Sequence, residues 1–284
     1  MTRRTLLLPL LLVGLLLTGC TGDDTGSTPD PGEPTGQTDG SPTTSTPTPP
    51  PTATPAPVPG NRKCRALDFD EAVAPTSPTR EVDCSGPHTA LTFHVGDLDT
   101  VLDGHLIAVD SDRVQDQVAT ECPERFARFV GGTEDEQRLS MLRTVWFTPS
   151  VEESDDGANW YRCDVVALRA DERLAPLTGR LAGVLARPEG RDRYAMCGTA
   201  EPGTPEFARV ICSTEHAWRA ITTIDFEGQE YPGLPVVRDD GQQRCEDLAG
   251  EAADDPLGFQ WGYEWPTAKQ WRDGQTYGLC WAPD

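Results

Sequence analysis

The sequence predicts an α+β fold in which two small disulfide-stapled domains follow one another, each with a short, mainly antiparallel sheet and one or two helices. Eight cysteines beyond residue 60 fall into two groups of four with similar spacing. A histidine stands four residues after the second cysteine of each group, and each group ends in an aromatic-rich segment. The shared order indicates an internal duplication. The cysteines are Cys64, Cys84, Cys122 and Cys163 in the first group, and Cys197, Cys212, Cys245 and Cys280 in the second.

Residues 1–19 have the pattern of a lipoprotein signal peptide. A short basic start precedes an apolar run from Leu6 to Leu17. This run is too short to cross a hydrocarbon core of about 30 Å, so it predicts a signal peptide and not a membrane helix. The segment that ends at Cys20 resembles the bacterial lipobox, in which cleavage before the cysteine leaves a lipid on its sulfur. We expect Cys20 to anchor the mature chain in the membrane. The alternative is an ordinary secretory signal in which Cys20 is incidental.

Residues 20–60 comprise the lipid-bearing cysteine and a linker made almost wholly of Thr, Pro, Gly, Ser and Asp. Because it has so few large apolar side chains, it cannot offset the entropy lost on ordering, and we expect it to be disordered. Its prolines favour an extended chain of about 3.1 Å per residue, so it reaches on the order of 100 Å at most. The linker therefore predicts a spacer between the membrane and the folded part.

The chain is strongly acidic. It has 24 Lys and Arg against 46 Asp and Glu, a formal net charge of −22, and the loss of Arg3 and Arg4 with the signal peptide makes the mature chain more acidic still. Such a surface repels nucleic-acid phosphates. We therefore expect no nucleic-acid partner, and no motif in the sequence indicates a cofactor.

Each predicted domain has a strand shortly after its Cys–His turn. Residues 90–95 and 218–224 are rich in β-branched and aromatic side chains, which favours strands. A helix follows in both, and in the second domain it is expected around residues 242–253. In the first domain, Asp110 and Ser111 can cap the helix. The residues expected on its inward face are Val114, Val118 and Cys122, which recur at helical spacing.

Pro123 leaves two alternatives for that first helix, because proline cannot donate the backbone hydrogen bond of a helix interior. Either the helix ends at Pro123, or a second short helix begins there. In the second case, the residues carried inward are Phe126, Phe129 and Val130.

Each domain is expected to close with an aromatic strand, a turn and a last strand that carries the fourth cysteine. These strands are predicted at residues 145–149 and 160–163, and again at 259–267 and 277–280. A further strand at 177–185 is expected to finish the first domain, with its glycines allowing a bulge.

The boundary between the domains is expected near residues 187–191, where Pro188, Glu189 and Gly190 have the composition of a link. This places the first domain at residues 61–187 and the second at 188–284.

An even number of cysteines in an exported chain predicts disulfides. Pairing within each group of four leaves only a few connectivities. We expect the first two cysteines of each group to join neighbouring strands, and the last two to join the helix to the final strand. The expected bonds are Cys64–Cys84, Cys122–Cys163, Cys197–Cys212 and Cys245–Cys280.

These residues resemble the septum-formation domain family of actinobacterial envelope proteins, which are often lipoproteins. The segment from Cys84 to His88 matches the Cys-x-x-Pro-His motif of that family. Trp265-Pro266-Thr267, followed by Trp271, Gly274 and Cys280, matches its second motif, while Glu215 replaces the motif's proline in the second copy. The resemblance implies two tandem copies in an extracytoplasmic protein linked to septation or the envelope. It implies no catalytic residue, ligand or activity.

We expect a membrane-anchored binding or scaffold module on the extracytoplasmic face of the cell membrane, with cell-wall or divisome proteins as partners and no enzymatic activity. One alternative is a cell-wall hydrolase that uses Cys84 with His88, or Cys212 with His216, as a thiol–imidazole pair. Another is a metal-binding protein, although a disulfide removes the thiolates that zinc requires. We expect His88 and His216 to be structural, with each ring bonded to backbone groups at its turn.

The tryptophans have two alternative roles. They form either a surface that contacts sugars or peptides, or part of the core, as large aromatic residues usually do. The residues concerned are Trp160, Trp261, Trp265, Trp271 and Trp281.

Overall fold

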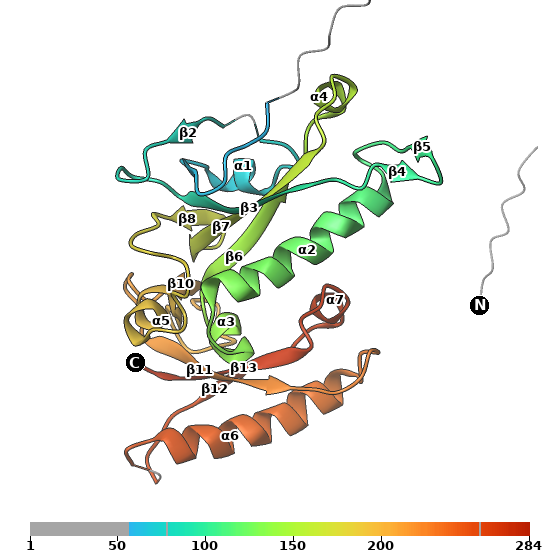
Figure 1. Cartoon of the computed structure of the whole chain (residues 1–284). Coiled ribbons are helices and arrows are strands. Elements are labelled where there is room, and N and C mark those ends of the chain that lie inside the picture. Colours follow the sequence, from blue (N-terminus) through green and yellow to red (C-terminus); the bar gives the residue numbers. More distant parts are fainter. Residues whose placement is uncertain (1–56, 78, 256) are drawn as a thin grey trace, which may run out of the picture. The chain divides into compact units, whose positions relative to one another are not determined.

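The computed structural model describes residues 57–284 except 78 and 256 (Figure 1). The expected signal peptide, Cys20 and the linker up to residue 56 lie outside the described residues. No helix in the described part of the chain is long and apolar enough to cross a membrane. The described residues belong to one compact unit.

The elements from β1 to β8, called repeat 1 below, contain a six-stranded sheet with the order β2-β1-β3-β7-β6, and β8 pairs with β7. All its strand pairs are antiparallel. Its strands are β1 (Cys64–Arg65), β2 (Glu81–Val82), β3 (Ala90–Asp97), β6 (Leu142–Phe147), β7 (Trp160–Ala170) and β8 (Arg173–Ala175). A separate hairpin pairs β4 (Val101–Leu102) with β5 (His105–Leu106).

The helices of repeat 1 include one long helix that runs beside the sheet (Figure 1). This is α2 (Asp112–Val130), whose buried residues are Val114, Val118, Cys122 and Val130. The first three are the inward face that the sequence predicts. The shorter helices are α1 (Phe69–Val73), α3 (Glu134–Arg138) and α4 (Val151–Asp155).

The elements from β9 to β13, called repeat 2, contain a five-stranded antiparallel sheet with the order β10-β9-β11-β13-β12. Its strands are β9 (Met196–Gly198), β10 (Arg209–Ile211), β11 (Trp218–Asp225), β12 (Gly262–Glu264) and β13 (Tyr277–Pro283). The helix α5 (Pro188–Tyr194) precedes it. A π-helical turn (Val236–Asp240) leads into α6 (Gly241–Ala252), and α7 (Ala268–Arg272) precedes β13.

The two sheets have the same strand order and the same register, which confirms the duplication. Cys64 of β1 pairs with β3 at Leu91, and Cys197 of β9 pairs with β11 at Arg219. A bulge interrupts the pairing of β3 with β7 just after Thr92, and another interrupts that of β11 with β13 just after Ala220. Since Thr92 and Ala220 each lie eight residues after the second cysteine, the bulges are equivalent.

The four expected disulfides are all present. They join Cys64 to Cys84, Cys122 to Cys163, Cys197 to Cys212, and Cys245 to Cys280. In each repeat the second bond connects the long helix to the last long strand, as predicted. The α+β class with two disulfide-stapled sheets is therefore confirmed.

Two local predictions in repeat 1 are wrong. First, α2 continues through Pro123 without a break. The helix is held on both sides of the proline, because Cys122 is bonded to β7 and Phe126 and Phe129 pack against the core beyond it. Packing on both sides offsets the cost of an interior proline, which is about 3 kcal/mol.

Second, residues 177–185 form no strand. Gly179 and Gly183 adopt positive φ angles of 74° and 64°, which interrupt an extended chain. The apolar side chains of the segment are nonetheless buried, since Leu177, Leu181 and Leu185 belong to the largest core cluster.

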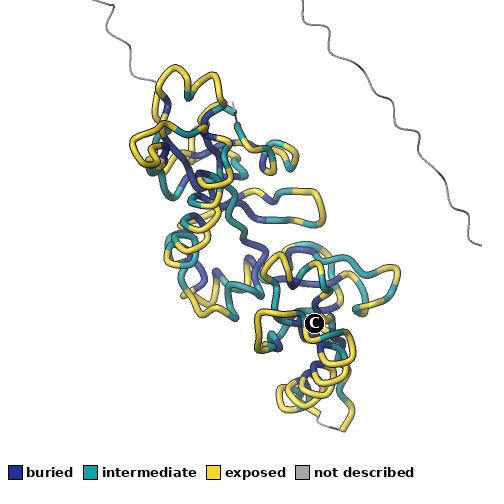
Figure 2. The backbone as a smooth tube through the Cα atoms, turned by 90° about the vertical axis from the view of Figure 1, so that its right-hand side faces the viewer, coloured by how far each residue is buried: buried dark blue, intermediate teal, exposed yellow. Residues whose placement is uncertain are grey.

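The largest core cluster contains side chains from both repeats. Leu142 and Val165 of repeat 1 share it with Leu279 and Trp281 of repeat 2. In Figure 2, buried residues follow the inner stretches of the chain, and exposed residues follow the loops and the outer helix surfaces. Residues 188–190, predicted as a link, lie in α5. The boundary between 187 and 188 stays a prediction.

Candidate functional site

The two Cys–His turns have the same geometry. His88 Nδ1 lies 2.8 Å from the carbonyl oxygen of Gly86, and His216 Nδ1 lies 2.7 Å from that of Thr214. The expected contact of each ring with the backbone of its turn is therefore confirmed. His216 makes one further contact, because its Nε2 lies 3.1 Å from the Asp284 carboxylate.

The cysteines of these turns are bonded, which bears on both chemical alternatives. A sulfur in a disulfide has no thiolate to attack a substrate or bind zinc. Donor atoms of Cys197, Cys212 and His216 lie within 4.8 Å of one another. While that disulfide is intact, the imidazole is the only strong metal donor of the three.

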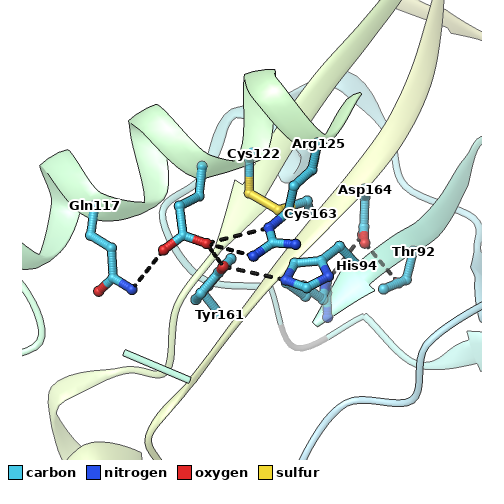
Figure 3. The surroundings of a disulfide bond; sticks show 10 residues. Thr92, His94, Gln117, Cys122, Arg125, Tyr161, Cys163 and Asp164 are labelled. Carbon is cyan, nitrogen blue, oxygen red and sulfur yellow. Dashed lines mark hydrogen bonds and ion pairs between the residues drawn. A yellow bond between two sulfur atoms is a disulfide. The ribbon is translucent and has the colours of Figure 1, made fainter. Parts of the chain in front are cut away.

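A polar network surrounds the Cys122–Cys163 bond on the helix side of the first sheet (Figure 3). The Tyr161 hydroxyl donates to the Glu121 carboxylate, which also accepts hydrogen bonds of 2.9 Å from Arg125 and 3.1 Å from Gln117. The bond from Tyr161 is the main cause that lowers the pKa of Glu121 to about 2. Burial, followed by the bond to Glu121, raises the pKa of Tyr161 to about 12.

The five tryptophans do not form one exposed surface. Trp160, Trp271 and Trp281 are buried, so the core alternative holds for them. Trp261 is half-buried, and only Trp265 is exposed.

A cleft on the other side of the first sheet is the strongest candidate for a binding site, and our reading of the sequence missed it. Its volume is about 710 Å³. Arg65 and Arg162 line it, although each is only 3% exposed. Arg65 directly follows the first cysteine of repeat 1, and Arg162 directly precedes the fourth. The rest of the lining includes Ser77, Thr79, Arg80, Glu81, Glu152 and Trp160.

The two buried arginines are linked through a chain of hydrogen bonds. Arg162 Nε donates to Asp164 Oδ2 over 3.2 Å, and the Thr92 hydroxyl donates to Asp164 Oδ1 over 2.7 Å. Arg65 Nη1 donates in turn to the Thr92 hydroxyl over 2.6 Å. The Arg162 guanidinium also lies over the ring of Phe147, 4.3 Å from its centroid. These contacts hold both guanidinium groups in place at the floor of the cleft.

Burial makes this network electrostatically costly. It raises the pKa of the Asp164 carboxyl and lowers the pKa of the Arg162 guanidinium, although each partner's charge opposes the shift of the other. Hydrogen bonding within the network is also incomplete. Among the described residues, five buried side-chain polar atoms lack a hydrogen-bond partner, and three of them belong to residues that line this cleft. They are Arg65 Nε, Ser77 Oγ and Arg162 Nη2.

Repeat 2 shows that the fold does not need this network. At the equivalent places beside its cysteines, Gly198 replaces Arg65 and Leu279 replaces Arg162. At the register of Thr92 and Asp164, repeat 2 pairs Ala220 with Trp281. These four residues of repeat 2 therefore form no comparable polar network. The strand order and register of repeat 2 are nevertheless the same as those of repeat 1. Aligning the two repeats is the signal by which the sequence alone would have identified the site.

Comparison with known families gives one result. A family model described as septum formation matches residues 37–153 and residues 63–280, and the second match covers more than half of the chain. The two overlapping matches are consistent with tandem copies. No curated protein and no solved structure matches the chain.

Proposed function

The chain belongs to the septum formation family, and we propose that it is a lipid-anchored, non-catalytic binding module on the extracytoplasmic face of the cell membrane. Its role would be to recruit cell-wall or divisome proteins at a site of septum formation. The family supports an association with the cell envelope, and the lipid anchor and the recruiting role are the parts that need a test.

The N-terminus supports the location. The apolar run that precedes Cys20 and the Pro- and Thr-rich linker that follows are the features of a tethered exported protein. The four disulfides agree with this, because such bonds persist in oxidising compartments and are rare where thiols are kept reduced.

The observation that carries the binding role is the arginine cleft. Repeat 2 has apolar residues at the positions of the network and keeps the same fold. Repeat 1 nonetheless retains a costly buried network at these positions. Buried ionic groups are weak evidence for stability, and incomplete hydrogen bonding makes them weaker still. Recognition of a partner is a reason to retain them.

The location is tested by fractionating cells that express the full chain or its Cys20→Ala variant. We expect the full chain in the membrane fraction, carrying a lipid mass, and the variant in the soluble extracytoplasmic fraction. Equal membrane attachment of both proteins would contradict the anchor.

The role is tested by cross-linking intact envelopes and identifying the proteins that co-purify with the full chain. We expect enrichment of wall-synthesis or division proteins that depends on Cys20. A set of partners no different from that of an unrelated lipoprotein would contradict recruitment. Release of labelled wall fragments by the purified protein would instead support the hydrolase alternative.

A further inference from the structure

We infer that the arginine cleft of repeat 1 binds a peptide through its carboxylate. This inference rests on the proposed binding function and names the chemistry of its ligand. Guanidinium groups with fixed orientation suit a carboxylate because they can donate parallel N–H bonds to its two oxygens. Arg65 and Arg162 are held in this way by Thr92 and Asp164.

The missing hydrogen-bond acceptors indicate what the cleft lacks. Arg65 Nε and Arg162 Nη2 are donors without an acceptor among the described residues. A buried donor without an acceptor destabilises the protein, and a charged donor does so more strongly than a neutral one. A carboxylate that enters the cleft would supply acceptors to guanidinium groups whose hydrogen bonding is incomplete.

The rim of the cleft favours a single negative charge over a double one. Exposed Arg80 adds a positive charge at the rim. Glu81, which pairs with Arg65 over 3.6 Å, also lines the cleft, together with Glu152 and Glu153. These carboxylates repel a doubly charged phosphate more strongly than a carboxylate. Thr76 and Thr148 also line the cleft, and hydroxyl groups can donate to and accept from the amide groups of a peptide backbone.

The position of the cleft within the duplicated fold also points to docking. In repeat 2, the side of β13 that carries Leu279 and Trp281 is covered by repeat 1, because both side chains share a core with Leu142 and Val165. The same side of β7 in repeat 1 carries Arg162 and Asp164 and lines or underlies the cleft. Repeat 1 therefore has a cleft on one side of its sheet. In repeat 2, the equivalent side of the sheet is packed against the other repeat.

The test measures binding of short peptides to the full-length protein in detergent by calorimetry. The probes are N-acetyl-alanyl-alanine, its carboxy-terminal amide and inorganic phosphate. We expect the free carboxylate peptide to bind at least about tenfold more tightly than the amide, since one charge-assisted hydrogen bond is worth this much. Phosphate should not compete. Equal binding of acid and amide, or stronger binding of phosphate, would overturn the inference.

The variants assign the binding to the cleft. Arg162→Leu combined with Asp164→Leu removes both charges, and Arg80→Glu reverses a charge on the exposed rim where folding is not at risk. Both should weaken acid binding at least about tenfold, whereas the exposed Arg272→Leu of repeat 2 should leave it unchanged. Unchanged binding by Arg80→Glu and by a folded double variant would overturn the assignment.

Two further comparisons complete the test. The first identifies the origin of the peptide, and the second separates a failure of the carboxylate site from a failure of the proposed recruitment. Peptides that end in D-alanine or in L-alanine distinguish a cell-wall peptide from a protein segment. If envelope partners are still captured by the double variant, the proposed recruitment stands and only the carboxylate site fails. If the peptide binds but no envelope partner is captured, the carboxylate site stands and the proposed recruitment fails.

Discussion

The Thr92 hydroxyl donates a 2.7 Å hydrogen bond to the fully buried Asp164 carboxylate, at the register where repeat 2 pairs Ala220 with Trp281. Asp164 also accepts from Arg162, which is itself buried. The buried charges of Arg162 and Asp164 therefore depend on each other for neutralisation.

Asp164→Ala should destabilise the protein strongly, because it leaves the Arg162 charge buried without its partner. The expected loss is about 3–5 kcal/mol, measured by urea unfolding. Arg162→Leu combined with Asp164→Leu should cost much less, since Arg65, the buried charge that remains, keeps its ion pair of 3.6 Å with Glu81. Equal losses in the single and double variants would show that the charge pair is not what the single variant disrupts.

Asp135 of α3 should couple the two repeats. Its Oδ1 accepts hydrogen bonds from the Thr223 amide, over 3.0 Å, and from the Thr223 hydroxyl, over 2.6 Å. Asp135→Ala should lower the free energy of unfolding by about 1.5–3 kcal/mol, because both bonds are to a charged acceptor. Thr223→Val should cost less, since the amide bond remains. A double-mutant cycle should be non-additive, and strict additivity would contradict the contact.

Glu121 should make stability depend on pH in the acid range. Its pKa in the folded protein is about 2, below the ordinary value near 4.5, so the folded state favours the ionised form. The stabilisation is present above pH 4.5 and is lost as the pH falls toward 2. Melting temperatures from pH 6 to pH 2 should show the gap between wild type and Glu121→Gln closing. Glu124→Gln, on the exposed side of the same helix, is the matched control for the removal of a carboxylate.

Tyr161 should produce the opposite dependence in alkali. Its pKa is raised from 10 to about 12, so the folded state favours the neutral phenol. The stabilisation is therefore lost as the pH rises from 10 toward 12. Tyr161→Phe should remove this alkaline loss, and its persistence in the variant would assign the loss to another group.

The two histidines should differ in their contribution to stability. His88→Ala removes one contact with a backbone carbonyl, worth about 0.5–1.5 kcal/mol. His216→Ala should cost more, because it also removes the contact with Asp284. Urea unfolding measures both, and partner capture should persist in each folded variant. Unchanged stability with lost capture would indicate a binding role instead.

Gly190 should not tolerate a side chain. A Cβ atom at this position would lie 2.0 Å from the Val184 carbonyl oxygen, and a backbone atom cannot move aside easily. Gly190→Ala should therefore cost about 1–3 kcal/mol or more by thermal or urea unfolding, despite the better helix propensity of alanine. Glu189→Ala, one residue earlier on the exposed side of α5, should change stability by no more than about 0.5 kcal/mol. Similar effects of the two changes would contradict the close packing.

The sequence was sufficient for features that depend on local spacing. The recurrence of the cysteines, each with its histidine or aromatic neighbours, predicted the duplication and all four disulfides. Helical spacing of Val114, Val118 and Cys122 predicted the buried face of α2, because a helix brings residues four apart onto one side. These patterns depend only on neighbours along the chain.

Features that depend on contacts between distant segments were decided by the tertiary structure. Pro123 lies inside a continuous helix because the chain on both sides of it packs against other elements. Arg65 and Arg162 are far apart in the sequence, and they lie at one cleft because β1 and β7 both pair with β3. Strand pairing brings together residues that are separated by long stretches of chain. The local periodicity of the sequence does not predict which distant charges will be buried next to each other. The sequence alone therefore determined the repeated framework, and the tertiary structure decided where that framework carries its candidate binding site.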